Sequence, residues 1–294
     1  MKIVRFHGGL GNQMFQYCFY ERLIKENDEV LADTSFFKKV KAHNGLEIER
    51  LFNIKLDKID YKMESFLFSK NKFIKLKRSI LKKINRFKIY TYFDTVYDES
   101  IIINSRRYSL YEGYWQSEKY FKVIEEDIRK KFIFPEIIEE KNLKILKSIQ
   151  EENSVSIHIR RGDYVGHPQL DGLAPIEYYK YAIEYIKKKV EKPKFFIFSN
   201  DLSWCKENLP LKEKEYELVE GNIGDSSYID MQLMGLCKHN IIPNSSFSWW
   251  GAWLNKNPKK IVIAPERWFT KESKFLYEDI VPTSWIKIKN FFKS

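Results

Sequence analysis

SVSIHIRRGDY, residues 154–164, is an apolar run that ends abruptly in charged residues. It is typical of a buried strand, and ligands of open α/β sheets collect beyond the carboxyl ends of such strands. Packing does not explain two arginines there, because unpaired buried charge is costly. The planar fork of Arg160 or Arg161 matches the oxygens of a diphosphate in a bidentate way. Asp163 either takes part in chemistry or merely orients an arginine.

Around this stretch, short apolar segments alternate with amphipathic ones, which predicts an α/β protein with parallel sheets. Strands are predicted at Lys2–His7, Val30–Asp33, Tyr108–Tyr114, Ser154–Arg160, Lys194–Ser199, Glu217–Val219, Asn240–Pro243 and Ile261–Ala264. Helices are predicted at Asn12–Glu26, Ser117–Lys131, Pro175–Val190, Ser226–Cys237 and Ser246–Asn255. The charged stretch 139–153 precedes the strongest strand. We therefore expect two domains, residues 1–152 and 153–294, with the last helix able to pack back on the first domain.

HGGLGNQM, residues 7–14, joins the first predicted strand to a helix. Its glycines allow a tight turn and a close approach of backbone to ligand. The helix that follows would offer free N–H groups and a positive dipole end to an anion. The stretch is neither a P-loop nor G-x-G-x-x-G, and a tight turn without a ligand explains it equally well.

Two further segments place polar residues beyond predicted strands. In FFIFSND, residues 195–201, Asn200 and Asp201 either cap the next helix or lie at the rim of the same crevice. In NSSFSWWGAW, residues 244–253, Ser245 and Ser246 either cap a helix or also help to hold phosphate. We expect Trp249 or Trp250 to pack between that helix and the sheet.

Composition limits the class of protein. The chain has 294 residues, 44% of them hydrophobic, and contains no apolar run long enough to span a membrane. The first residues lack the apolar stretch of a signal peptide, so a cytoplasmic location is expected. Three scattered cysteines, Cys18, Cys205 and Cys237, suit neither a disulfide framework nor a metal knuckle.

The net charge of +11 is concentrated in one segment. Between Lys55 and Lys88, twelve Lys or Arg stand against three acidic residues, a local excess of nine positive charges. Phe73, Ile80, Ile84 and Phe87 recur there at roughly helical spacing, which indicates an amphipathic basic helix. A solvated lysine-rich face, docking on an anionic membrane or lipid-linked acceptor, and nucleic-acid binding all remain open; no nucleic-acid motif accompanies the charge.

The motifs in this order resemble the bacterial α1,2-fucosyltransferase family, from Phe6 to about Trp268. That family has a Gly-Gly-Leu-Gly-Asn-Gln loop, a His-x-Arg-Arg-Gly-Asp-Tyr strand end and a closing Asn-Ser-Ser-Phe-Ser-Trp-Trp-Gly-Ala-Trp-Leu stretch. The resemblance implies a GT-B-like fold of two Rossmann-type domains facing across a cleft. It also implies GDP-β-L-fucose as donor, a galactose-terminated oligosaccharide as acceptor, inversion, and no metal or other cofactor. The chain contains no Asp-x-Asp, the usual sequence of metal-dependent nucleotide-sugar enzymes.

The resemblance also implies roles for individual residues. Arg160 would bind the diphosphate and stabilise its departure, and Arg161, Asn200 and Asp201 would lie around the donor. His158 and Asp230 would contact guanine or ribose, and Ser245, Ser246 and Phe247 would line phosphate and fucose. Gly9, Gly11, Asn12 and Gln13 would approach from the opposite domain. By position only, Asp163, His167 and Asp171 are candidates for the general base.

Two other hypotheses stay open. One is a GT-B transferase that uses another nucleotide sugar or acceptor hydroxyl. The other, from a different class, is a basic protein that binds a membrane surface or nucleic acid through residues 55–90 and has no catalytic activity. Under the transferase hypothesis we expect no nucleic-acid partner, and contact of the 55–90 segment with the inner face of a membrane remains open.

Overall fold

The computed structural model describes residues 1–26, 29–40, 44–84, 86–92, 96–103, 108–273 and 277–289. It divides the chain into two compact units, Met1–Phe134 (unit 1) and Pro135–Ser294 (unit 2). This boundary lies earlier than the one predicted after residue 152. The charged stretch at which the boundary was placed is an amphipathic helix, and its buried Ile149 packs in the core of unit 2. Within the described ranges, no helix has the length and apolar character needed to cross a membrane.

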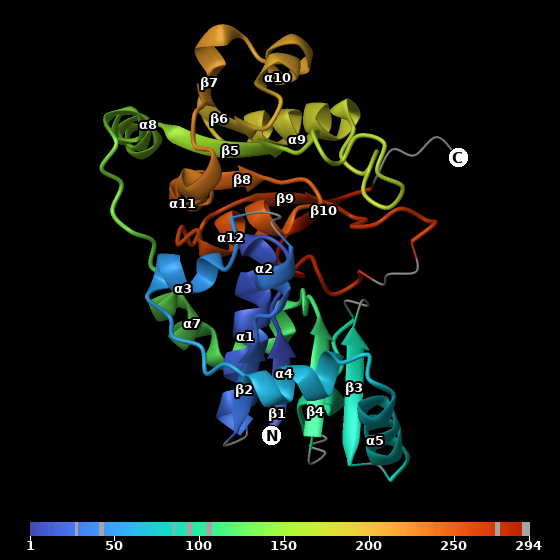
Figure 1. Ribbon diagram of the computed structural model, residues 1–294. Coiled ribbons are helices and arrows are strands. Elements are labelled where there is room, and N and C mark those ends of the chain that lie inside the picture. The colour runs from blue at the N-terminus through green and yellow to red at the C-terminus, as the bar shows by residue number, and fades with distance from the viewer. Residues whose placement is uncertain are drawn as a thin grey trace. The chain divides into compact units, whose positions relative to one another are not determined.

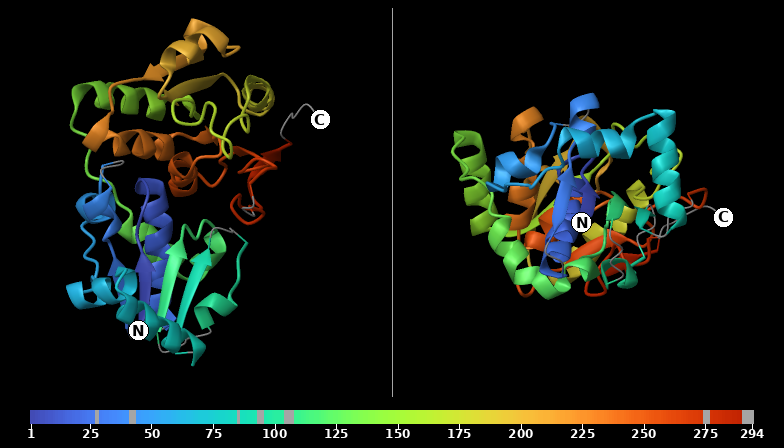
Figure 2. Two further views of the ribbon diagram at one scale, coloured as in Figure 1. Left: turned by 45° about the vertical axis from the view of Figure 1, so that its right-hand side comes forward. Right: turned by 60° about the horizontal axis from the view of Figure 1, so that its bottom comes forward.

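Unit 1 is built on a four-stranded parallel sheet with strand order β2-β1-β4-β3 (Figures 1 and 2). Its strands are β1 (Lys2–Arg5), β2 (Val30–Asp33), β3 (Phe87–Tyr92) and β4 (Tyr108–Gly113). Its helices are α1 (Leu10–Glu26), α2 (Phe36–Lys39), α3 (Glu47–Phe52), α4 (Tyr61–Phe68), α5 (Lys72–Lys83), α6 (Ser100–Ile103) and α7 (Glu125–Lys131), with 3-10 turns η1 (Glu118–Tyr120) and η2 (Lys122–Ile124). The single helix predicted at Ser117–Lys131 is therefore two 3-10 turns followed by α7.

Unit 2 contains a six-stranded parallel sheet with strand order β10-β9-β8-β5-β6-β7 (Figure 1). Its strands are β5 (Asn153–Ile159), β6 (Pro193–Ser199), β7 (Tyr216–Val219), β8 (His239–Ile241), β9 (Val262–Pro265) and β10 (Ile286–Ile288). Its helices are α8 (Glu140–Glu151), α9 (Ile176–Lys189), α10 (Leu202–Asn208), α11 (Tyr228–Leu236) and α12 (Ser246–Leu254), with 3-10 turns η3 (Glu213–Glu215) and η4 (Gly224–Ser226). Counted in chain order, the strands have the 3-2-1-4-5-6 arrangement of a Rossmann fold.

Two hydrophobic cores cover the faces of the unit 2 sheet. On one face, Val155 and Ile157 of β5 pack with buried residues of α9 and α10. On the other, Phe196 and Phe198 of β6 pack with buried residues of α8 and α11. Because successive side chains of a strand point to opposite faces, β6 contributes to both cores, with Phe195 and Ile197 on the first face.

Several predictions of local structure are confirmed and others are corrected. All three cysteines are buried and free, as expected, and Trp249 and Trp250 are both fully buried. The amphipathic basic helix exists as α5, but Phe87 begins β3 instead of extending the helical face. Beyond α12, the described residues form β9 and β10 with no further helix, and residues 290–294 lie outside the described part.

The glycine in the tryptophan-rich stretch is explained by the packing of α12 on α11. A Cβ at Gly251 would lie 2.8 Å from Cβ of Met234 and 3.3 Å from the carbonyl oxygen of Met231. The two helices therefore approach more closely than a larger residue would allow.

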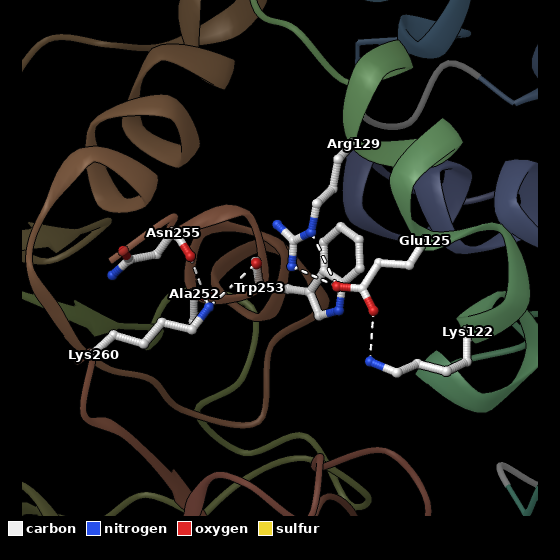
Figure 3. Close-up of polar contacts among 7 residues, drawn as sticks. All are labelled: Lys122, Glu125, Arg129, Ala252, Trp253, Asn255 and Lys260. Atoms are coloured by element: carbon white, nitrogen blue, oxygen red, sulfur yellow. Dashed lines mark hydrogen bonds and ion pairs between the residues drawn. The ribbon is translucent and has the colours of Figure 1, made fainter. Parts of the chain in front are cut away.

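A lysine closes the carboxyl end of α12 (Figure 3). Lys260 Nζ donates to the carbonyl oxygens of Ala252, Trp253 and Asn255 at 2.7, 3.3 and 2.9 Å. The last carbonyls of a helix have no partner within the helix, and they lie at the negative end of its dipole. Lys260 therefore supplies hydrogen-bond donors to these carbonyls and a positive charge at the negative end of the dipole. In unit 1 the same figure shows Glu125 of α7 between Lys122 and Arg129.

We expect Lys260→Met to lower the free energy of unfolding by about 1–2 kcal/mol, because the carbonyls lose charged donors. Urea denaturation measures the change. Lys259→Met, at the exposed neighbouring position, is the matched control and should change stability little. Equal effects of the two substitutions would show that the contacts of Lys260 contribute nothing specific.

Candidate functional site

The unit 2 sheet has a switch point between β5 and β8. From β5 the chain winds outward in one direction to β6 and β7, and from β8 in the other to β9 and β10. Ligands of such sheets bind beyond the carboxyl ends of the two strands at this point. Arg160 follows the last residue of β5, and the 242–245 turn leads from β8 into α12. The predicted arginine and the predicted helix start are thus brought to one edge of the sheet.

Arg160 is held by Asp163. Its Nε lies 2.7 Å from Oδ1 of Asp163 and its Nη2 lies 3.0 Å from Oδ2. About a third of the Arg160 side chain remains exposed at the sheet edge. Of the two roles left open for Asp163 by the sequence, the contacts supply the orienting one.

Arg161 points into a different environment. Its Nε lies 3.0 Å from Oδ2 of Asp201, and its guanidinium carbon lies 4.3 Å from the ring centre of Trp204. Asp201 also caps α10, since Oδ1 accepts a hydrogen bond from the Trp204 backbone N–H. Asn200 Oδ1 accepts from the Arg161 backbone N–H at 3.0 Å, and a Cβ at Gly162 would lie 2.3 Å from its Nδ2. These side chains shape the strand end. No local sequence pattern marked Trp204 as a site residue.

The two other base candidates hold the loop of residues 164–172. Asp171 accepts hydrogen bonds from the backbone N–H groups of Gly166 and Gly172, both at 2.7 Å. His167 Nδ1 accepts from the Gln169 N–H at 3.2 Å. Both glycines have positive φ, so the sharp turns of this loop need these residues.

Tyr164 and Asn244 tie this loop to the turn after β8. The Tyr164 hydroxyl donates to the carbonyl oxygen of Asn244 at 3.1 Å. Asn244 Nδ2 donates in turn to the carbonyls of Leu170 and Trp268. A cavity of about 270 Å³ lies next to this connection, and its lining includes Arg160, Arg161, Tyr164, Asp171, Tyr179 and Trp204.

His158 is a neutral imidazole at the end of β5. It is 5% exposed, and its ring centre lies 6.0 Å from that of Phe247 in α12. Burial lowers its pKa to about 3, with the charge of Arg160 adding to the effect and that of Asp163 opposing it. Its buried Nδ1 has no hydrogen-bond partner within the described part of the chain. A buried nitrogen of this kind is suited to a ligand that supplies the missing partner.

Asp230 lies in a buried amide network. Its Oδ1 accepts a hydrogen bond from Asn222 at 2.8 Å, and Asn222 exchanges two hydrogen bonds with Asn142 of α8. Burial raises the pKa of Asp230 to about 7, against the smaller opposing effects of the Asn222 hydrogen bond and the Lys141 charge. Neither asparagine was predicted from the sequence, because nothing local marks a contact between residues so far apart.

The amino end of α12 contains the predicted serines. Ser245 is the N-cap residue and is buried, yet its side chain makes no capping hydrogen bond. Ser246 and Phe247 are the first residues of the helix, where N–H groups have no intrahelical acceptor. The capping explanation therefore does not account for Ser245, and the helix start keeps the character of an anion site.

The glycine-rich loop of unit 1 begins at Gly8, whose φ of +79° favours glycine. Gly9 O accepts hydrogen bonds from the N–H groups of Asn12 and Gln13, and Gly11 is buried within α1. Gln13 is fully buried: Nε2 donates to Gly8 O and Gly45 O, and Oε1 accepts from the N–H groups of Glu47 and Ile48. The Gln13 amide thus shapes the loop from inside. Asn12 accepts a hydrogen bond from Gln116 at 2.8 Å.

His7 marks the switch point of unit 1, where β1 and β4 run side by side. Its ring lies 4.7 Å from that of Tyr114, which follows β4. Burial and then the Arg5 charge lower the pKa of His7 to about 4, against a hydrogen bond with Gly113. Its Nε2 is buried without a hydrogen-bond partner in the part of unit 1 that the structure describes. The sequence placed His7 in the loop without marking it as a site residue.

The arrangement defines a class of enzyme. Two α/β units with parallel sheets, one of them with an arginine and a helix start at its switch point, define a GT-B-like glycosyltransferase. The chain belongs to glycosyl transferase family 11, whose model matches residues 1–289. Among the described residues, no group of three or more His, Cys, Asp or Glu is arranged to hold a metal ion.

Known proteins with similar sequences and folds agree with this class. An α-1,2-colitosyltransferase of Escherichia coli is 35% identical, over 98% of each chain. The galactoside α-(1,2)-fucosyltransferase 2 of Gorilla gorilla gorilla is 27% identical, over 50% of this chain and 45% of its own length. A mutant of FUT1 from Arabidopsis thaliana, solved in complex with GDP, has a similar fold, with a TM-score of 0.50 and 11% identity over 90% of this chain and 70% of its own.

The raised pKa of Asp230 predicts a pH dependence of stability. Between about pH 4 and pH 7 the carboxyl group keeps its proton when folded and loses it when unfolded, so its contribution to stability falls as the pH rises through this range. Asp230→Asn removes the titration and keeps an oxygen acceptor for Asn222. The variant should lose less stability than the wild type between pH 5 and pH 8, measured by urea unfolding.

The control is Asp225→Asn, at an exposed position on the preceding turn. It should follow the wild-type pH dependence. If Asp230→Asn also follows it, the carboxyl group is not protonated in the folded protein.

Proposed function

We propose that this chain transfers L-fucose from GDP-β-L-fucose to the 2-hydroxyl group of a terminal galactose in a glycan, with inversion and without a metal ion. The observation that carries the proposal is that Arg160 and the amino end of α12 lie at the carboxyl edge of adjacent strands. The named activity of the gorilla relative and the GDP bound to the Arabidopsis enzyme support this choice of donor.

In the proposed reaction, the bond between C1 of fucose and the diphosphate oxygen breaks. The acceptor 2-oxygen forms its bond to C1 from the opposite face, which inverts the configuration. Negative charge builds up on the departing GDP, and the Arg160 guanidinium and the first N–H groups of α12 would stabilise it. Preorganised donors of this kind lower a barrier because they need no reorientation as the charge develops.

The guanosine part of the donor would lie against His158, Phe247 and Asp230. The unpartnered Nδ1 of His158 offers a hydrogen-bond position beside an aromatic ring. Asp230 offers a carboxyl group that is already oriented by Asn222. An ionised carboxylate accepts hydrogen bonds from the adjacent N–H groups of guanine, so donor binding would favour loss of the Asp230 proton.

The proton of the acceptor hydroxyl needs a base. Asp163, His167 and Asp171 remain candidates by position, although each is engaged by the contacts described above. His7 is a further candidate, because its imidazole is neutral and its Nε2 is without a hydrogen-bond partner among the described residues. It also lies at the ligand-binding edge of the unit 1 sheet.

A second donor sugar is favoured by one observation. The relative that matches 98% of the chain is named for the transfer of colitose, which is fucose without its 3-hydroxyl group. In either transfer GDP would be the leaving group. Arg160 and the start of α12 would therefore stabilise the departing charge in both reactions. The choice depends on whether a polar group of the site binds the 3-hydroxyl.

Donor identity can be measured with the purified chain. GDP-fucose should raise the melting temperature and UDP-sugars should not, because only a bound ligand stabilises the folded state. Incubation of lactose with GDP-fucose should give a product with an α1,2 linkage by NMR. A larger kcat/KM with GDP-colitose would assign the second sugar instead.

Metal independence is tested in the same assay. The rate should be unchanged by EDTA, because fixed charges and N–H groups are proposed to replace a cation. Loss of activity on chelation, with recovery on adding manganese, would contradict the proposal.

Arg160→Ala should lower kcat by at least about 100-fold, roughly 3 kcal/mol of transition-state stabilisation, with the fold intact. Arg160→Lys keeps the charge but loses the fork, and should recover part of the rate. Lys259→Ala is the control for removal of a positive charge from an exposed position of unit 2. Near-normal turnover of Arg160→Ala, with the thermal unfolding of the wild type, would remove Arg160 from the mechanism.

A further inference from the structure

Helix α5 leaves its apolar side chains in solvent. No residue of the helix is buried; Phe73 is 83% exposed, Leu76 60% and Ile80 50%. Ile84, which follows the helix, is 53% exposed. Single exposed apolar residues are ordinary, but a contiguous row on one element marks an interaction surface.

The row lies along one side of the helix. Successive members are separated by three, four and four residues, the spacing at which helical side chains are neighbours. The helix also contains six basic residues and no acidic one. Lys72, Lys75, Lys82 and Lys83 are all exposed. At helical spacing, Lys72 and Lys83 stand beside the row, and Lys75 and Lys82 lie on the far side of the helix. A merely solvated lysine-rich face does not explain the apolar row.

An apolar cavity of about 400 Å³ lies under α5. Its walls come from α4, α5, the first strand residues and the chain just before them: Met1, Ile3, Met63, Phe66, Leu67, Lys77, Leu81, Arg86, Phe87 and Tyr108. Lys77 and Arg86 are the only charged residues among these, so cationic groups stand next to apolar walls. Figure 1 shows α5 beside β3.

The cavity is separate from the candidate site of unit 1. It lies where β1, β3 and β4 begin, whereas His7 and Gly8 follow the carboxyl end of β1. These are opposite edges of the same sheet, about one strand length apart. The α5 surface and its cavity therefore have no place in the proposed transfer chemistry.

We propose that α5 and the cavity beneath it form a docking surface for an anionic lipid bilayer. Phe73, Leu76 and Ile80 enter the boundary between headgroups and acyl chains, and the flanking lysines contact anionic headgroups. An amphipathic helix with a basic polar face binds membranes in this way. The excess of nine positive charges in residues 55–88 complements an anionic surface.

The experiment is vesicle co-flotation of the full chain. Phosphatidylcholine vesicles with phosphatidylglycerol should bind it, and phosphatidylcholine vesicles alone should not. Phe73→Ser combined with Ile80→Ser should weaken binding at least about tenfold, because the apolar area that enters the bilayer is lost. Lys72→Gln combined with Lys83→Gln should weaken it by about fivefold per lysine, and added salt should also weaken it.

The matched control is Ile138→Ser combined with Ile223→Ser. These residues of unit 2 are 76% and 81% exposed, so the control removes a comparable amount of exposed apolar surface from outside residues 55–88. It should bind anionic vesicles as the wild type does. All variants change exposed positions, and urea unfolding confirms that they keep their stability.

Three outcomes would overturn the proposal. One is absence of binding to anionic vesicles, and another is equal binding to neutral ones. The third is undiminished binding by the Phe73 and Ile80 variant. Light scattering covers the case in which vesicles do not bind. If the wild type is then a dimer and the Phe73 and Ile80 variant is a monomer, a second copy of the chain covers the apolar row of α5. If the lysine variant instead loses affinity for a DNA duplex, the partner is nucleic acid.

Discussion

The site depends on how the carboxyl ends of β5, β8 and β9 are held together. Two buried tyrosines of α9 do this: the Tyr178 hydroxyl contacts the carbonyl oxygens of Ile242 and Ile263 at 2.6 and 3.0 Å. The Tyr179 hydroxyl donates to the carbonyl of His158 at 3.1 Å. Burial raises the pKa of both hydroxyls well above the usual range, so they stay neutral. One helix therefore fixes the strand ends from which the arginine and the helix start project.

Most polar residues of the motifs use their hydrogen bonds on the protein itself. Gln13 joins two loops of unit 1, Asn244 joins the 164–172 loop to the turn after β8, and Asp201 holds Arg161. These contacts fix the backbone around the site. Their side chains would not contact a ligand directly. What remains for a ligand is a short set, with His158, Arg160 and the start of α12 at its centre. Rigid placement of a few groups is what electrostatic stabilisation requires.

The sequence predicted the elements with strong hydrophobic periodicity and missed those without it. All the predicted strands are present. Strand β3 was not predicted, because its sequence FKIYTY contains a lysine and follows a lysine-rich helix. The charged stretch 139–153 was used to place the domain boundary, but it forms helix α8, whose Ile149 packs in the core of unit 2. Residue types at the strand ends indicated a site, whereas partners such as Asn142 with Asn222, eighty positions apart, could not be read from local pattern.

The pairing of Arg160 with Asp163 bears on how the site would treat a diphosphate. A guanidinium has five N–H donors, and Asp163 accepts one hydrogen bond from Nε and one from Nη2. The carboxylate holds the plane of the fork in place, so less side-chain entropy is lost when a second anion binds. Asp163 also offsets part of the positive charge of Arg160, which lowers the affinity of the site for an anion before the reaction begins. Charge that develops later, on a leaving diphosphate, would meet donors already in position, which favours the transition state over the ground state.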